Sequence, residues 1–472
     1  MQLLLLGLAL VVFLHDAPEA AGLRVALPAW ATLGVVLLPK LAVGVGYWAW
    51  CAAVRRRLGT PGGLRSLNRL NRGAAVLPIV ALGLYVIDLW AGALDAVRGS
   101  VVGGQRVGLA PRDTILLDEL AVMLPTLGLV VFSWWAYGPI DRRLREASLI
   151  RRADAGLPIY PVWGRGRYVW MQARFQLGLI LVPLLLILAW SESVVRLAGA
   201  GVVSDGAALW LMPVGAGLVF VAAPLVVRRL WDTVPLPAGP TRDRLVAVCE
   251  RHGVRVRGLL LWRSFGGMIN AAVVGLFGPL RYILLSDGLL DQVKQPQVEA
   301  VLAHELGHVK LRHLAWLAAA ALALGVTLSG LGEWALGGVS EPWVLAAAAA
   351  AGLVAWAAGF GWVSRRVERQ ADTFAVRHVA EASADPDGEP PRHFDAASVA
   401  VMVDALQSVA VLNHVPPTRR SWRHGSIAWR QAYLRTLVGT PLDHAPIDRL
   451  MQGVNAAVAA VLAAGLAWAT LG

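Results

Sequence analysis

Long apolar segments alternate with short polar segments along most of this chain. An α-helix needs about 20 apolar residues to cross a bilayer. Two short apolar segments, 1–14 and 456–471, are predicted to be membrane helices, with a cleaved signal peptide as the alternative for the first. Seven longer segments predict spanning helices over residues 25–54, 74–97, 114–138, 175–195, 208–227, 314–331 and 343–363.

Two longer polar regions follow residues 227 and 363. The first combines short runs of branched residues with amphipathic segments, which predicts a small α+β domain. Its expected elements are a helix over 242–252, strands over 254–261, 268–276 and 282–285, a turn at 286–288, and helical structure from 289 to 313. The second region predicts helices over 364–378, 394–412 and 426–437.

The composition agrees with a membrane protein, since 57% of the residues are hydrophobic, 16% are charged and the mean hydropathy is +0.58. The net charge of +12 does not require a nucleic-acid partner, because the arginines cluster at the ends of the predicted spans. Two clusters, within 55–72 and 142–167, mark loops that face the cytoplasm by the positive-inside rule. Counting spans forward from these loops places 228–313 and the segment after 363 on that same side.

Only two cysteines occur, Cys51 within a predicted span and Cys249 in the first polar region. They supply neither a disulfide framework nor a thiolate cluster. A metal site in this chain must therefore use nitrogen and oxygen ligands.

The first polar region contains the pentapeptide His304-Glu305-Leu306-Gly307-His308. On a helix, residues four apart lie on one face, so both imidazoles can reach one tetrahedral metal ion. Glu305 then points beside the metal, where its carboxylate can take a proton from metal-bound water. No helix breaker interrupts residues 298–313, which supports the helix. The pattern predicts a hydrolytic zinc site.

Two histidines leave a catalytic zinc one protein ligand short. Glu368 is the best candidate for the third ligand, because the order of spans puts it on the same side as the pentapeptide. Asp372 lies one helical turn further on the same face, where it can accept the free ring N–H of a ligating histidine. Taken alone, this segment is more typical of a solvated, charge-paired helix end.

Together these motifs resemble the membrane zinc metallopeptidase family that includes the HtpX heat-shock protease and the CAAX prenyl endopeptidase. The resemblance covers about residues 235–430. It implies a catalytic base at Glu305 and a supporting carboxylate at Asp372. It further implies that one zinc ion per chain is bound by His304, His308 and Glu368.

The resemblance extends to two weaker motifs. Asn270 and Ala271 resemble an edge strand that receives the substrate backbone by strand addition, although an asparagine beside glycines is also typical of a turn. His424 and Arg430 resemble a downstream His-Pro segment with an arginine six positions on, in which Gly425 here replaces the proline. The resemblance implies that either side chain stabilises the oxyanion, and a simple helix start is the alternative.

The pattern and the resemblance together predict a mainly α, polytopic transmembrane helical protein with a small α+β zinc metallopeptidase (gluzincin-like) domain. The predicted boundaries are N-terminal transmembrane helices over 1–232, the first part of a cytoplasmic metallopeptidase domain with the zinc-binding helix over 233–313, a transmembrane hairpin over 314–363, the second part of that domain over 364–454, and a C-terminal apolar helix over 455–472.

Other ionisable residues lie within or beside the spans. His313 stands nine residues after His304 and off the ligand face, so we expect it at the membrane interface or behind a ligand. Acidic side chains in such places line a hydrophilic chamber or snorkel to water. The acidic residues concerned are Asp88, Asp95, Asp118, Glu119 and Glu192.

We expect an integral, multi-pass zinc metalloendopeptidase of the bacterial cytoplasmic membrane with its site on the cytoplasmic side. It would hydrolyse peptide bonds of membrane-associated or misfolded proteins by glutamate-assisted attack of zinc-bound water. Its expected partners are a polypeptide substrate and the lipid bilayer, and no nucleic acid. Two other functions stay open: CAAX-type processing of prenylated C-termini, and a protease-based signal transducer. A non-catalytic scaffold is disfavoured because every hydrolytic element is present.

Overall fold

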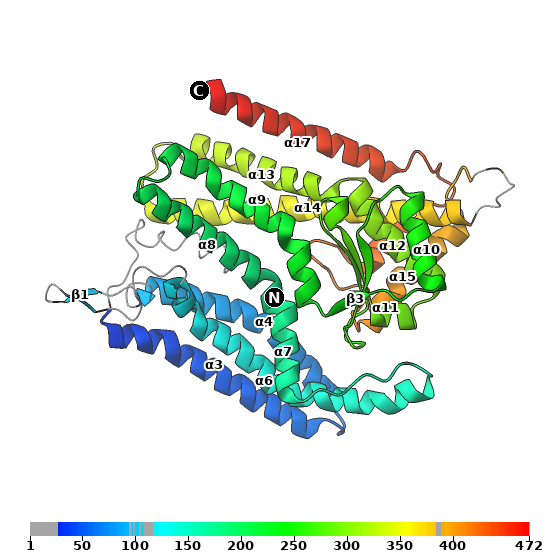
Figure 1. Cartoon of the computed structure of the whole chain (residues 1–472), viewed down its shortest axis with the longest axis horizontal. Helices are drawn as coiled ribbons and strands as arrows, with labels where there is room; N and C mark the ends of the chain where they lie inside the picture. The colour runs from blue at the N-terminus through cyan, green and yellow to red at the C-terminus, as the bar shows by residue number, and fades with distance from the viewer. Residues whose placement is uncertain are drawn as a thin grey trace. The chain divides into compact units, whose positions relative to one another are not determined.

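The chain divides into two compact units, Met1–Trp231 and Asp232–Gly472. A computed structural model, drawn in Figure 1, describes residues 27–93, 97, 100–102, 105–107, 117–383, 389 and 391–471. Within these residues, eight helices are long and apolar enough to cross a bilayer: Trp30–Arg57, Gly63–Trp90, Leu120–Asp154, Leu181–Gly199, Asp205–Leu230, His313–Leu336, Trp343–Ala382 and Pro446–Trp468. A mainly helical, multi-pass membrane protein is thereby confirmed.

Each of the seven long apolar segments coincides with one of these helices, and the helix predicted over 456–471 is also present. The predicted helix over 1–14 lies outside the described residues. The differences concern helix ends, because polar turns continue several helices past the apolar segment. The second helix begins at Gly63 rather than near 74, and the third runs on to Asp154.

The first unit contains two groups of packed helices. One helix, α3 (Ala29–Arg57), packs against both α4 (Gly63–Trp90) and α6 (Leu117–Asp154). Further along the chain, α8 (Leu179–Gly199) packs against α9 (Asp205–Leu230). The shorter elements of this unit are β1 (Ser100–Val102), β2 (Gln105–Val107), α7 (Arg165–Gln172) and a π-helical turn, Ala173–Gly178.

Lys40 on α3 and Asp88 on α4 form a buried ion pair in the first unit. Lys40 Nζ lies 2.7 Å from each Asp88 carboxylate oxygen, and the side chains are only 5% and 1% exposed. Asp88 therefore neither snorkels nor lines a chamber alone. Glu192 pairs with Arg196 along α8. The side chains of Asp95, Asp118 and Glu119 lie outside the described part of the chain.

Lys40→Met is expected to destabilise the protein, because it leaves the Asp88 carboxylate buried without its cation. Breaking a buried pair on one side costs about 3–5 kcal/mol, whereas replacing both partners by apolar residues is often close to neutral. The double variant Lys40→Met/Asp88→Leu should therefore recover most of the lost stability. Thermal unfolding in one detergent measures both variants, and equal destabilisation of the two would contradict this account.

The second unit contains a four-stranded sheet in the order β3-β4-β6-β5. β4 and β6 are parallel, and the outer strands β3 and β5 are each antiparallel to their neighbours. The strands are β3 (Thr233–Pro235), β4 (Gly258–Trp262), β5 (Ala271–Val274) and β6 (Tyr282–Ser286). Three of them fall within or on the predicted strand segments, whereas β3 was missed because three residues beside prolines show no periodicity.

The helices of the second unit flank the sheet and continue into the membrane spans (Figure 1). The two polar regions supply most of the shorter helices, as predicted. The helical elements are α10 (Pro240–Arg251), the 3-10 turn Gly278–Leu280, α11 (Asp287–Gln292), α12 (Gln295–Lys310), α13 (His313–Leu336), α14 (Pro342–Ala382), α15 (Ala396–Leu412), α16 (Ile427–Arg435) and α17 (Pro446–Leu471).

The turn predicted at 286–288 is wrong, because this segment begins α11. The Ser286 hydroxyl caps the helix by accepting from Leu289 N–H at 3.2 Å, and it also accepts from Asn270 N–H at 2.9 Å. Asp287 accepts from the Phe265 N–H at 2.6 Å. These contacts tie the loop before β5 to the start of α11.

The pentapeptide helix α12 lies between two hydrophobic cores. Leu302 and Leu306 pack into the core beneath the sheet and α10, while Ala300 and Ala303 join the core formed with α14, α15 and α16. Gly307 allows a close approach to α14, because an added Cβ would lie 3.2 Å from the Phe374 side chain. The helix that carries both histidines therefore packs closely against α14.

Candidate metal centre

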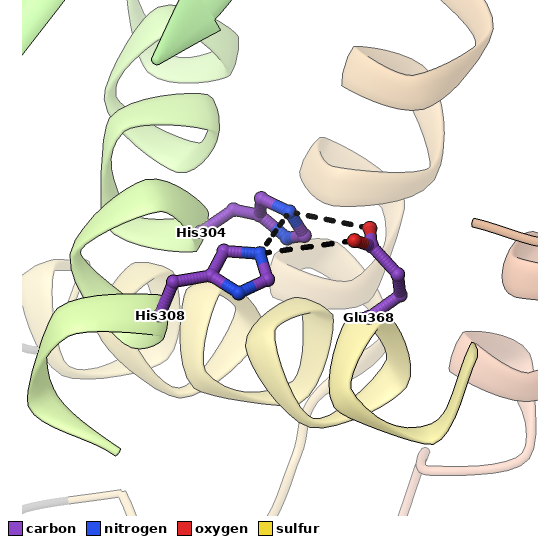
Figure 2. A group of neighbouring side chains, drawn as sticks. All are labelled: His304, His308 and Glu368. Atoms are coloured by element: carbon purple, nitrogen blue, oxygen red, sulfur yellow. Dashed lines mark hydrogen bonds and ion pairs between the residues drawn. The ribbon is translucent and has the colours of Figure 1, made fainter. Parts of the chain in front are cut away.

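Three side chains from two helices converge on one point (Figure 2). His304 and His308 extend from α12, and Glu368 extends from α14. The two Nε2 atoms lie 3.2 Å apart, and Glu368 oxygens lie 3.7 Å from His304 Nε2 and 4.0 Å from His308 Nε2. All three ligand atoms lie within 4.8 Å of one another.

This arrangement fits a zinc ion. With Zn–N and Zn–O bonds near 2.0–2.2 Å, ligand atoms of a tetrahedral site are roughly 3.3 Å apart, close to the separations found here. Burial lowers the pKa of His308 well below its ordinary value, which keeps the imidazole in the neutral form that binds metals. His304 and Glu368 are buried, and two nitrogens with one carboxylate form a typical catalytic zinc ligand set.

Asp372 and Arg430 lie directly behind the ligands. His304 Nδ1 is 2.9 Å from Asp372 Oδ1. Arg430, on α16, donates from Nε to Asp372 at 2.7 Å and places Nη1 3.2 Å from Glu368. Burial works against the charge of Arg430, but the two carboxylates outweigh it and raise its pKa. One guanidinium therefore orients both carboxylates.

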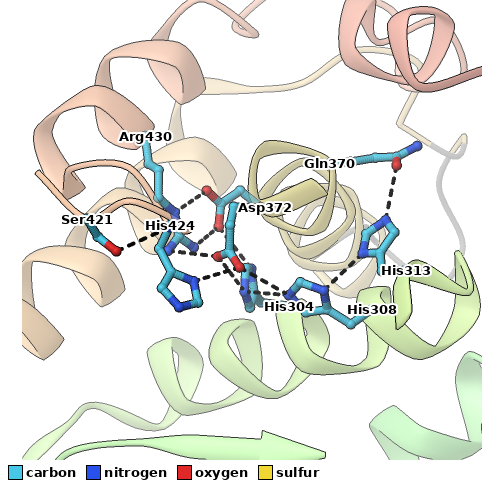
Figure 3. Close-up of polar contacts among 9 residues, drawn as sticks. His304, His308, His313, Gln370, Asp372, Ser421, His424 and Arg430 are labelled. Carbon is cyan, nitrogen blue, oxygen red and sulfur yellow. Dashed lines mark hydrogen bonds and ion pairs between the residues drawn. The ribbon is translucent and has the colours of Figure 1, made fainter. Parts of the chain in front are cut away.

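His424 approaches the same ligand from the solvent side. Its Nδ1 lies 2.8 Å from Glu368 Oε1, and its side chain is 56% exposed (Figure 3). Gly425 follows it with φ of +73°, in the left-handed region where glycine is favoured, and Ser426 then caps α16 by accepting from Trp429 N–H. The structure thus brings both His424 and Arg430 into contact with Glu368.

Glu305 points into the cavity beside the ligands rather than at their meeting point. It borders a cavity of about 1140 Å³ that His304, His308 and Glu368 also line. Burial raises the pKa of its carboxyl group, and a hydrogen bond from the Val273 backbone opposes this rise. The carboxylate is consequently anchored to β5 and has an increased proton affinity.

The strand β5 borders the same cavity and lies at the edge of the sheet. The main-chain carbonyl of Asn270 accepts from Ser286 N–H at 3.0 Å, so the main-chain groups of Asn270 face β6. Main-chain groups alternate in direction along an antiparallel strand, so those of Ala271 and Val273 point away from β6. Ile269, the preceding outward residue, is paired through both main-chain groups with the Asn413 side chain, at 3.0 and 2.8 Å. The Asn413 side chain thus pairs with the edge at Ile269 as an added strand would. The next outward-facing residue along the edge is Ala271.

Some contacts of the site could not be read from the sequence. His313 lies behind His308, with the two Nδ1 atoms 3.0 Å apart, as its position off the ligand face allowed. Three contacts were missed, because each joins distant segments: Val273 with Glu305, Gln370 with His313, and Gln370 with Asp448. No local motif marks any of them.

Similarity to a known family covers the segment that carries the three ligand residues. Residues 265–391 match the family model described as peptidase family M48. No curated protein matches the chain. The crystal structure of S. mikatae Ste24p is similar at 14% sequence identity and a TM-score of 0.43, covering 87% of this chain and 99% of that chain.

The membrane helices, the mixed sheet and the ligand set define a membrane metallopeptidase. Residues 265–391, which contain the three ligand residues, match peptidase family M48, and the protein is a zinc-dependent metalloendopeptidase. The family resemblance predicted from the pentapeptide and the Glu368 segment is therefore confirmed.

Proposed function

We propose that His304, His308 and Glu368 hold one zinc ion and that Glu305 is the general base of peptide hydrolysis. The observation that carries this proposal is the shared cavity: Glu305 faces the same space as the three converging ligand atoms without belonging to them. A carboxylate beside the metal, and not bound to it, is free to move a proton.

Zinc bound at this site supplies a Lewis acid that activates water and polarises the scissile carbonyl. The Glu305 carboxylate accepts a proton from the attacking water and passes it to the leaving amine as the peptide bond breaks. The raised pKa of Glu305 suits a group that must hold this proton between the two steps. His424 and Arg430 remain our candidates for stabilising the oxyanion, and the exposed His424 lines the cavity directly.

The substrate we propose is an extended segment of a membrane-associated or misfolded protein, cleaved on the cytoplasmic side. Asn270 and Val273 line the cavity, and the main-chain groups of Ala271 between them point away from β6, which supports strand addition at this edge. Main-chain pairing tolerates many side chains, which suits varied substrates. The arginine-rich loops of the first unit support the cytoplasmic orientation.

Chelator treatment of the full-length protein in detergent is expected to abolish cleavage of an unfolded casein substrate, because the ligands alone cannot activate water. Zinc content should fall from about one ion per chain, and zinc should restore both occupancy and cleavage, whereas magnesium should not, since it prefers all-oxygen sites. Unchanged cleavage by metal-free protein would contradict the proposal. A farnesylated peptide assayed beside casein tests the narrower specificity for prenylated C-termini.

A further inference from the structure

We propose that a hydrogen-bonded chain through His313, Gln370 and Asp448 fixes which ring nitrogen of His308 faces the metal. His308 Nδ1 lies 3.0 Å from His313 Nδ1, and His313 Nε2 lies 3.1 Å from Gln370 Oε1 (Figure 3). Gln370 Nε2 donates to Asp448 Oδ1 at 2.8 Å, and Asp448 Oδ2 accepts from Arg377 at 3.0 Å. The inference rests on the proposed zinc site and assigns positioning residues to it.

The fold brings these residues together from three helices. Arg312 has φ of +54° and separates α12 from α13, and this bend turns His313 back toward His308. Gln370 projects from α14 two residues after Glu368, and Asp448 lies in the first turn of α17. His313 is only 2% exposed and Gln370 only 8%, so their polar atoms depend on one another rather than on water.

The Asp448 carboxylate determines which group donates in each hydrogen bond between it and His308. Asp448 can only accept, so the Gln370 amide must present its NH₂ group to Asp448 and its oxygen to His313. His313 must then donate from Nε2, which leaves its Nδ1 as an acceptor in the neutral ring. His308 therefore donates from Nδ1, and its Nε2 lone pair is directed at the metal site.

The ring proton of His304 is placed on Nδ1 by a direct carboxylate contact. Its Nδ1 lies 2.9 Å from the Asp372 carboxylate, so its Nε2 also faces the metal site without a proton. Each ligand histidine is thus set by a carboxylate, one in direct contact and one through two intervening side chains. The second arrangement makes the start of the C-terminal helix α17 part of the support of the metal site.

Asp448→Asn should reverse the direction of donation along these hydrogen bonds, from residue 448 to His308. Asp448→Ala should only remove the last partner and leave the direction undetermined. Arg377 can only donate, so the oxygen of an asparagine would face Arg377 and its NH₂ group would face Gln370. The amide of Gln370 must then turn around, and His308 would carry its proton on Nε2, toward the metal. We expect zinc affinity to fall by about 10–100-fold in Asp448→Asn and by less in Asp448→Ala.

Exchanging the amide at 370 and the carboxylate at 448 should restore the original direction of donation between His308 and His313. In Gln370→Glu/Asp448→Asn, the carboxylate at 370 accepts both from the amide at 448 and from His313 Nε2. Zinc affinity of this double variant is expected to return near that of the wild type. Asp443→Asn is the matched control, because Asp443 is 74% exposed and pairs only with His444 among the contacts described.

The experiment measures zinc affinity of each metal-free, full-length variant by competition with a chelator, together with its thermal midpoint in the same detergent. A merely structural role predicts that asparagine, the closer substitute, is milder than alanine and that the exchange adds a second defect. Tighter zinc binding by Asp448→Asn than by Asp448→Ala would overturn the proposal. Failure of the double variant to regain zinc affinity would also overturn it. Wild-type protein that binds no zinc would instead refute the proposed function.

Discussion

Glu305→Gln is expected to abolish peptide hydrolysis while the protein keeps its zinc. The amide preserves the size of the side chain but cannot take a proton from water. General acid–base catalysis contributes about 10²–10⁴-fold, so kcat should fall by at least that factor on an unfolded protein substrate. Zinc content should stay unchanged, because Glu305 lies beside the three converging ligand atoms and is not one of them.

Glu299→Gln provides the control for this experiment on the same helix. Glu299 accepts a hydrogen bond from Gln295 at 3.1 Å and does not line the cavity, so its variant should retain both zinc and activity. Cleavage by Glu305→Gln at the wild-type rate would show that another group is the base. Loss of zinc from this variant would instead make Glu305 a ligand.

Glu368→Ala is expected to lower zinc affinity by more than about 100-fold, beyond the 10–100-fold typical of groups that only support a ligand. The substitution removes the single oxygen donor of the three-residue group. It also deprives His424 of its carboxylate partner, which lies 2.8 Å from Nδ1. Metal analysis after gel filtration, paired with casein cleavage, should show that both are lost together.

Two further variants of α14 separate loss of a ligand from damage to the helix. Glu381→Ala removes an exposed carboxylate from the same helix and should leave zinc content unchanged. Glu368→Asp keeps the carboxylate but shortens its reach by one methylene, so partial occupancy is expected. Full occupancy in Glu368→Ala would mean that the third ligand is another residue.

Local patterns predicted most of the fold. Hydropathy predicted the spanning helices because crossing a bilayer requires about 20 apolar residues whatever the tertiary context. Strand segments within 254–285 were also recognised, although β5 is shorter than its predicted segment and β3 was missed. A three-residue strand carries too little periodicity to be detected, since its pairing with β4 alone defines it.

The sequence by itself determined the pairing of His304 with His308, because residues four apart on a helix always share a face. It also indicated Glu368 and Asp372, through their spacing and a family resemblance. Only the tertiary structure decided that Arg430 lies between those carboxylates and that Asp448 reaches His308 through two other side chains. Contacts between distant segments depend on how helices pack and where backbones bend, which local periodicity does not encode.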